Sequence, residues 1–121
     1  MREEMLKSIL SELNGTSAEI EASAAISTDG LVIASILSSD MDEDRIGAMA
    51  ATMLSLGERT SYELGRGKLE QVLIKGENGY ILMTSAGNDT VVCVVTKASA
   101  KLGLIFLDIK RAAESISKII S

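Results

Sequence analysis

The chain has 121 residues, of which 46% are hydrophobic and 24% charged, and this composition predicts one globular domain over residues 1–121. Its net charge of −5, with 12 lysines and arginines scattered along the chain, argues against binding to nucleic acid or to an anionic membrane surface. No stretch approaches the roughly 20 apolar residues of a spanning helix, so we expect no membrane insertion. The N-terminus lacks a secretory signal pattern, so we expect a cytoplasmic protein.

The first part of the chain predicts a helix and then a β-hairpin. Apolar residues recur at helical spacing over residues 2–13 and share one face: Met5, Leu6, Ile9, Leu10 and Leu13. Asn14-Gly15 then resembles a glycine C-cap. Strand-like runs follow at residues 22–28 and 31–37, and the Asp29-Gly30 pair between them is a strong hairpin signal.

Residues 42–65 predict a long helix with two unlike faces. One wide arc is mainly apolar and is expected to pack on a sheet: Ile46, Met49, Ala50, Met53, Leu56, Gly57, Thr60 and Leu64. The opposite face carries small residues: Ala48, Ala51, Thr52 and Ser55. Small residues let another helix come close, so this face is a candidate contact with a second chain. A plain surface helix explains the same pattern equally well.

The second half predicts three strands and a final helix. The strands are residues 69–75, 80–85 and 90–96, joined by short turns, and consecutive valines in the last one indicate that both of its faces are covered. The final helix begins within residues 99–103 and ends near Ile120. The predicted fold is therefore an α/β (α+β) sandwich of order α-β-β-α-β-β-β-α. Its five-stranded antiparallel sheet has the long helix on one face and the two terminal helices on the other.

Catalytic signatures are missing from the sequence. Histidine is absent, which removes the usual proton shuttle, the commonest metal ligand and the Ser-His and Cys-His pairs. The acidic run at residues 40–44 lacks the glycine and the closing glutamate of a calcium loop, and no phosphate-binding glycine loop is present. We therefore expect a protein that is not an enzyme, with no catalytic residue, cofactor or metal site.

The order of these segments resembles a known family. An amphipathic helix ending in Asn14-Gly15 precedes the run DGLVIAS at residues 29–35, and an alanine- and methionine-rich helix, a three-strand meander and the closing run at 102–113 follow. This pattern resembles the Roadblock/dynein light chain family, and within it the prokaryotic MglB group. The resemblance covers essentially the whole chain and brings no catalytic motif with it.

The resemblance implies a dimer that serves small Ras-like GTPases. Family members pair their middle helices across a two-fold axis and join their sheets through the strand that follows, which here is residues 69–75. The expected dimer interface is Ala48, Ala51, Thr52, Ser55, Leu69, Gln71, Val72 and Leu73. The expected GTPase contacts are Glu58, Arg59, Tyr62 and Arg66. Self-pairing would also protect a strand edge that is otherwise exposed, although the charges of Lys68, Glu70 and Lys75 could protect it alone.

Three functional hypotheses follow from the sequence. The first is a non-catalytic homodimeric platform that binds and regulates a Ras-like small GTPase. The second is an adaptor of the same architecture that holds a motility, transport or polarity complex together without affecting nucleotide turnover. The third is a small-molecule sensor, which the low aromatic content of 2% makes less favoured because ligand pockets commonly use aromatic rings.

Overall fold

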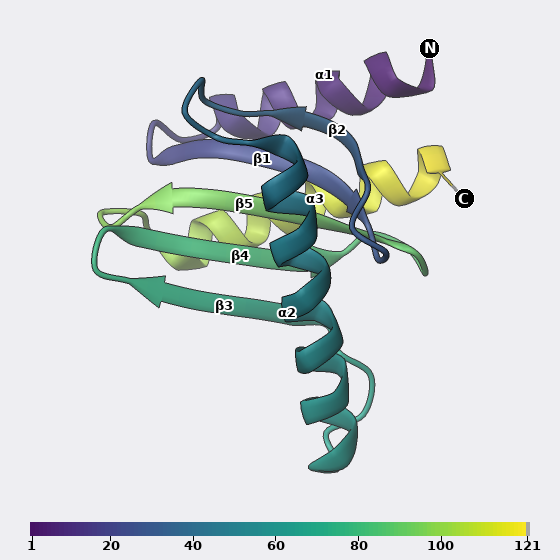
Figure 1. The fold of residues 1–121 in the computed structure, drawn as a ribbon. Coiled ribbons are helices and arrows are strands. Elements are labelled where there is room, and N and C mark those ends of the chain that lie inside the picture. The colour runs from purple at the N-terminus through teal and green to yellow at the C-terminus, as the bar shows by residue number, and fades with distance from the viewer. Residues whose placement is uncertain (121) are drawn as a thin grey trace.

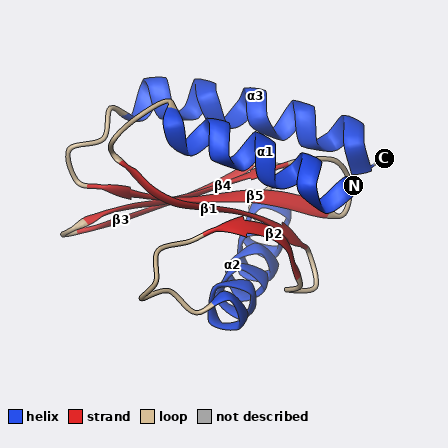
Figure 2. Cartoon of the chain, turned by 90° about the horizontal axis from the view of Figure 1, so that it is seen from above, coloured by secondary structure: helices blue, strands red, loops and turns tan. Residues whose placement is uncertain are grey.

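A five-stranded antiparallel sheet lies between two helical layers in the computed structural model, which describes residues 1–120 (Figures 1 and 2). The strand order across the sheet is β2-β1-β5-β4-β3. The helices α1 and α3 cover one face and α2 crosses the other (Figure 2). In chain order the elements are α1 (Arg2–Gly15), β1 (Ile20–Ser27), β2 (Val32–Ile36), α2 (Glu43–Glu63), β3 (Gln71–Gly76), β4 (Gly79–Ser85), β5 (Thr90–Lys97) and α3 (Leu102–Ile120). The predicted architecture and element order are confirmed.

The central strands are buried on both faces because helices lie on both sides of the sheet. The face under α1 and α3 packs Leu6, Leu10, Val92, Val94 and Ile109 into the larger core. The opposite face packs Ile26, Met83 and Cys93 under Ala50 and Leu54 of α2. The valines of β5 therefore alternate between two apolar layers, as their uninterrupted run predicted.

The C-cap predicted at Asn14-Gly15 is wrong in detail. Helix α1 continues through Gly15, which does not adopt a positive φ. Thr16 caps the helix instead, because both its backbone N–H and its hydroxyl donate to the carbonyl oxygen of Leu13. Met5, expected in the core, is 48% exposed near the free end of the helix.

Helix α2 begins at a side-chain cap and touches the sheet over a narrow strip. The carboxylate of Asp42 accepts from the backbone N–H groups of Asp44 and Arg45, as expected for an acidic N-cap. The buried residues of α2 are Gly47, Ala50 and Leu54. The wide core arc predicted for this helix is therefore partly wrong, since four of its members are exposed: Met49, Leu56, Thr60 and Leu64.

Two glycines let the first half of α2 approach the β1–β2 turn. Gly30 has a φ of +96°, a left-handed conformation that favours glycine, and it lies directly against the helix. A β-carbon added to Gly47 would lie 2.2 Å from the carbonyl oxygen of Gly30. The backbone of Gly47 and the backbone of Gly30 are therefore in close contact. A rotamer change could not make room for a side chain at Gly47.

We expect the substitution Gly47→Ala to destabilise the fold. Overpacking costs about 1–3 kcal/mol, and the upper end applies here because the added β-carbon would lie 2.2 Å from a backbone oxygen. Alanine regains about 1 kcal/mol of helix propensity, so a net loss of about 2 kcal/mol in the free energy of unfolding is expected. Urea denaturation at fixed protein concentration measures it. The control is Gly103→Ala in α3, where an added β-carbon meets nothing within 4 Å. An unchanged midpoint for Gly47→Ala would contradict the close contact.

Candidate functional site

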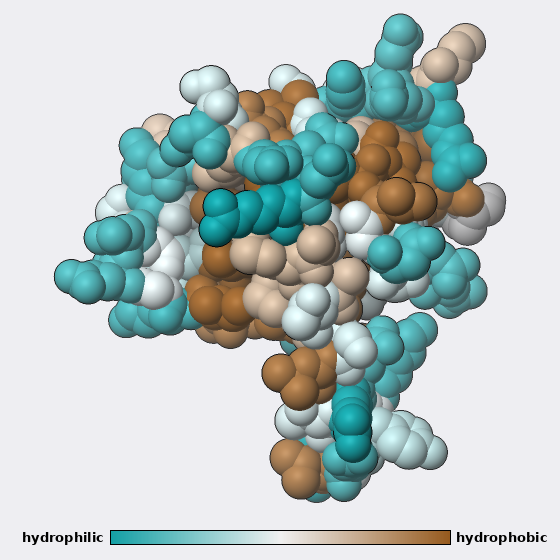
Figure 3. Space-filling model, in the orientation of Figure 1, coloured by the Kyte–Doolittle hydropathy of each residue, from teal (hydrophilic) through white to brown (hydrophobic). Residues whose placement is uncertain are grey.

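The second half of α2 extends beyond the edge of its own sheet (Figure 1). The helix crosses the start of β3 at Gly57, where an added β-carbon would meet Leu69 at 3.1 Å and Val72 at 3.5 Å. After this crossing, the next helical turns have no strand beneath them. Apolar side chains are nevertheless exposed there, with Tyr62 at 80% and Leu64 at 69%. Figure 3 shows brown, hydrophobic patches on this protruding part of the molecule.

Strand β3 is an edge strand with apolar side chains exposed to solvent. It pairs with β4 from Gln71↔Thr84 to Gly76↔Gly79, and its other edge has no strand partner within residues 1–120. Leu73 is 46% exposed on the α3 side of the sheet and Ile74 is 36% exposed on the α2 side. Such an edge presents unpaired backbone groups together with apolar surface, which is a template for pairing with another strand.

The opposite edge strand, β2, differs from β3 in burial. Its five residues are all buried or half-buried, whereas β3 is exposed at all but one position. The overhang of α2 and the open edge of β3 lie on the same side of the molecule, so one partner could cover both. Together these two features form the candidate dimer interface.

The eight interface residues predicted from sequence all lie on these two elements or beside them. In α2, Ala48, Thr52 and Ser55 are exposed and Ala51 is half-buried. At the β3 edge, Gln71 and Leu73 are exposed, while Leu69 and Val72 are half-buried under Gly57. The residues are therefore grouped in space, and their role in an interface stays a prediction.

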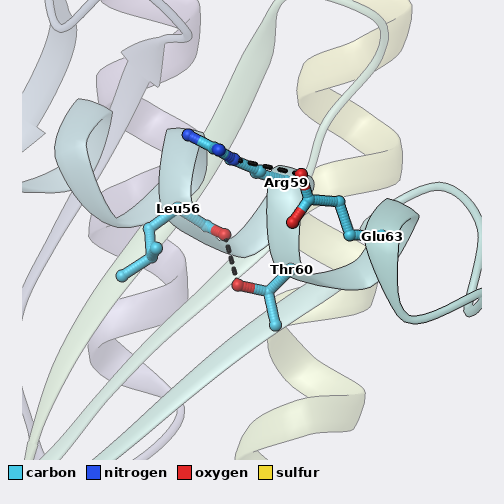
Figure 4. A network of polar contacts seen from close by, with 4 residues as sticks. All are labelled: Leu56, Arg59, Thr60 and Glu63. Carbon is cyan, nitrogen blue, oxygen red and sulfur yellow. Dashed lines mark hydrogen bonds and ion pairs between the residues drawn. The ribbon is translucent and has the colours of Figure 1, made fainter.

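The predicted GTPase contacts Glu58, Arg59, Tyr62 and Arg66 are all exposed at the free end of α2. The Nε atom of Arg59 donates to Oε1 of Glu63 at 3.3 Å, one helical turn away (Figure 4). The Nε atom of Arg66 donates to the carbonyl oxygen of Leu64 at 3.1 Å. Both guanidinium groups thus retain N–H donors that a partner could use.

An open groove of about 720 Å³ lies between the start of β3, the end of β4 and α3. Lysine and glutamate side chains line its walls, among them Lys68, Lys110 and Glu114, and an aromatic ring is missing from its lining. An open, mixed-charge groove differs from the enclosed apolar site that a small-molecule sensor needs. Within residues 1–120, acidic and cysteine side chains do not gather as a set of metal ligands.

Comparison with known proteins identifies the family. The sequence pattern of the Roadblock/LC7 domain matches residues 6–96, about three quarters of the chain. The chain belongs to the Roadblock/LC7 family. This confirms the family resemblance noted from the sequence. The likeness to the prokaryotic MglB group is a likeness of fold.

Relatives and solved structures agree with this assignment. The uncharacterized protein MJ1340 of Methanocaldococcus jannaschii is 46% identical over 112 residues, which cover 93% of this chain and 96% of the relative. The gliding protein MglB of Thermus thermophilus superposes with a TM-score of 0.86 at 20% identity, over 98% of this chain and 90% of that one. A structure described as MglB with tetrameric arrangement superposes at 0.88 with 21% identity, over 98% and 89%. At these identities the structural likeness shows a shared fold.

Sequence reasoning missed part of this site because it placed Met49, Leu56 and Leu64 in the core. Helical periodicity identifies which residues share a face, but it does not show where the helix leaves the sheet. The sequence did carry one signal of this exposure in the Roadblock/LC7 domain. The apolar arc of α2 is wider than the strip that contacts the sheet.

None of the helices in residues 1–120 is both long and apolar enough to cross a membrane.

We expect the ion pair between Arg59 and Glu63 to contribute little to stability. Both side chains are well exposed, at 76% and 62%, and exposed pairs at this helical spacing stabilise by about 0.3–0.5 kcal/mol. Arg59→Ala should therefore change the free energy of unfolding by less than about 0.5 kcal/mol in urea denaturation. Glu63→Ala is the matched control and should behave alike. A loss above about 1 kcal/mol for either variant would mean that the pair has a structural role.

Proposed function

We propose that this Roadblock/LC7 domain forms a homodimer that acts as a non-catalytic platform for a Ras-like small GTPase. The observation that carries the proposal is the unfinished surface of a single chain, in which the β3 edge and the end of α2 are both exposed. A second copy placed beside β3 would extend the sheet and lie under the overhanging helix. The similarity to MglB gliding proteins, one of them described as tetrameric, supports self-association.

The GTPase would bind the outer surface of the paired α2 helices. Glu58, Arg59, Tyr62 and Arg66 are exposed there and offer both charges and one aromatic ring. Arginine and tyrosine are the side chains that interfaces favour, since they combine hydrogen bonds with a large contact area. The four GTPase-contact residues are therefore proposed as the recognition surface.

Regulation in this proposal comes from ordering the GTPase, not from chemistry supplied by the platform. A protein that prefers one arrangement of the GTPase switch segments shifts their population and so changes hydrolysis or exchange. The alternative is an inserted arginine, with Arg59 and Arg66 as candidates, because such a group can accelerate hydrolysis about 10³- to 10⁵-fold. The adaptor function is the second proposal, in which binding occurs with no change in either rate.

The decisive experiment adds the purified protein to the small GTPase encoded nearest to its gene and follows single-turnover hydrolysis and nucleotide exchange. We expect a changed rate with wild-type protein and a change of less than about tenfold on substituting Arg59→Ala or Arg66→Ala. Lys110→Ala, on the far face of the sheet, is the control. A loss of about 10³-fold for either arginine variant would contradict the non-catalytic role. Binding with unchanged rates would favour the adaptor, and absence of binding would contradict both.

A further inference from the structure

The face of the sheet under α1 and α3 is left uncovered at β3. Helix α1 packs on β1 and β2, and helix α3 packs on β4 and β5. Packed helices lie about 10 Å apart and strands about 4.8 Å apart, so two helices cover about four strands. Within residues 1–120, no helix lies behind β3 in Figure 1. The groove of about 720 Å³ lies along this uncovered strip.

The walls of this groove carry alternating charges. Lys110, Glu114 and Lys118 are exposed side chains of α3 that line one wall, each about one helical turn from the next. At a rise of about 1.5 Å per residue, neighbouring charges are about 6 Å apart along the helix. The other wall, just before β3, carries Lys68 and Glu70. The groove therefore has an excess of positive charge, although the whole chain has a net charge of −5.

The positive charge of the groove is not neutralised by carboxylates of the chain. Among the described residues, Arg59 and Glu63 form the only ion pair, and none of the lysines in the groove takes part in it. Glu114 is one helical turn from both Lys110 and Lys118, so it is shared between two lysines. The wall of α3 thus keeps charge that a ligand of opposite sign can neutralise.

The floor of the groove contains a buried hydroxyl group without a partner. Thr84 lines the groove near the end of β4, on the same side of the sheet as Leu82, which packs in the core under α3. The Oγ1 atom of Thr84 is buried and makes no hydrogen bond within residues 1–120. Buried hydroxyl groups normally have a partner, because an unsatisfied one costs free energy. A polar ligand in the groove could supply that bond after a rotation of the Thr84 side chain.

An extended peptide matches the spacing of the charges on α3. The groove is open along its length, which suits a chain segment better than a small molecule. Alternate residues of an extended strand point to the same side and are about 6.6 Å apart. This distance is close to the spacing of about 6 Å on the helix. Acidic, basic and acidic side chains at the first, third and fifth residues of a peptide would therefore meet Lys110, Glu114 and Lys118 in turn.

We propose that the groove between α3 and the start of β3 binds an extended segment of a partner protein in which acidic, basic and acidic residues alternate with uncharged ones. The excess positive charge, to which Lys68 contributes, favours a segment that is negative overall. Exposed charges are screened by salt, so the affinity should fall as ionic strength rises. The groove lies on the opposite face of the sheet from α2, so this inference is independent of the proposed dimer and GTPase platform.

Two peptides test the proposed charge pattern. The test peptide is capped, labelled with fluorescein, and alternates glutamate, lysine and glutamate with threonine. The control peptide has the lysine and the glutamates exchanged. In fluorescence anisotropy at low salt, we expect the wild-type protein to bind the test peptide at least about tenfold more tightly than the control peptide. Equal binding of the two peptides, or no binding of the test peptide, would overturn the inference.

Inverting the charges of the α3 wall should invert this preference. The triple variant Lys110→Glu, Glu114→Lys and Lys118→Glu changes three exposed positions and should bind the control peptide more tightly than the test peptide. Exposed substitutions of this kind change the free energy of unfolding little, and circular dichroism checks the fold. Arg59→Glu on α2 is the matched control and should leave the affinity for the test peptide unchanged. A triple variant that keeps the wild-type preference would place the peptide elsewhere and overturn the inference.

A measurement on the wild-type protein covers the case in which the triple variant fails to fold. Adding the test peptide to isotope-labelled protein should shift the amide NMR signals of Gln71, Thr84 and Glu114, which line the groove. The amide signals of α2 should stay in place, because α2 lies on the other face of the sheet. Shifts confined to α2 would contradict binding in this groove.

Discussion

The unpaired edge of β3 is the constraint on which the rest of the structure depends. Leu73 and Ile74 are exposed on this strand. The unpaired N–H and C=O groups of its free edge can form hydrogen bonds with water or with another strand. Natural sheets blunt such edges with charges, turns or covering segments. Here the cover is a helix that runs past the edge and ends over empty space (Figure 1). The exposed end of α2 and the unpaired edge of β3 lie on the same side of the molecule. A symmetric partner would cover the helix and pair with the strand.

The two faces of the sheet serve different purposes as a result. Helices α1 and α3 cover one face with buried aliphatic side chains such as Leu10, Ile109 and Ile116. This face of the sheet, apart from β3, is therefore covered within a single chain. Helix α2 buries only small residues and Leu54 on the other face. At one end, Gly47 lies in close contact with Gly30 of the β1–β2 turn. The other end is free to take part in an interface.

Much of the fold was predictable because the relevant signals are local. Helical and strand periodicity, Asp29-Gly30 and the acidic cap at Asp42 define elements whose bounds match the structure within one or two residues, and even α1 differs only in running through Gly15. The candidate site was predictable only as far as the elements that carry it. The position of α2 relative to the sheet edge depends on the Gly47–Gly30 contact and on strand register, which are not local. For this reason Met49, Leu56 and Leu64 were placed in the core although they are exposed.

Amide hydrogen exchange across a series of protein concentrations tests the central claim most directly. If β3 pairs with a second copy, the exchange protection of Gln71–Gly76 and of the last turns of α2 should rise together with concentration. The amides of β5, which are buried in a single chain, should keep the same protection throughout. Fast exchange of β3 at every concentration, with α2 equally unaffected, would contradict the account.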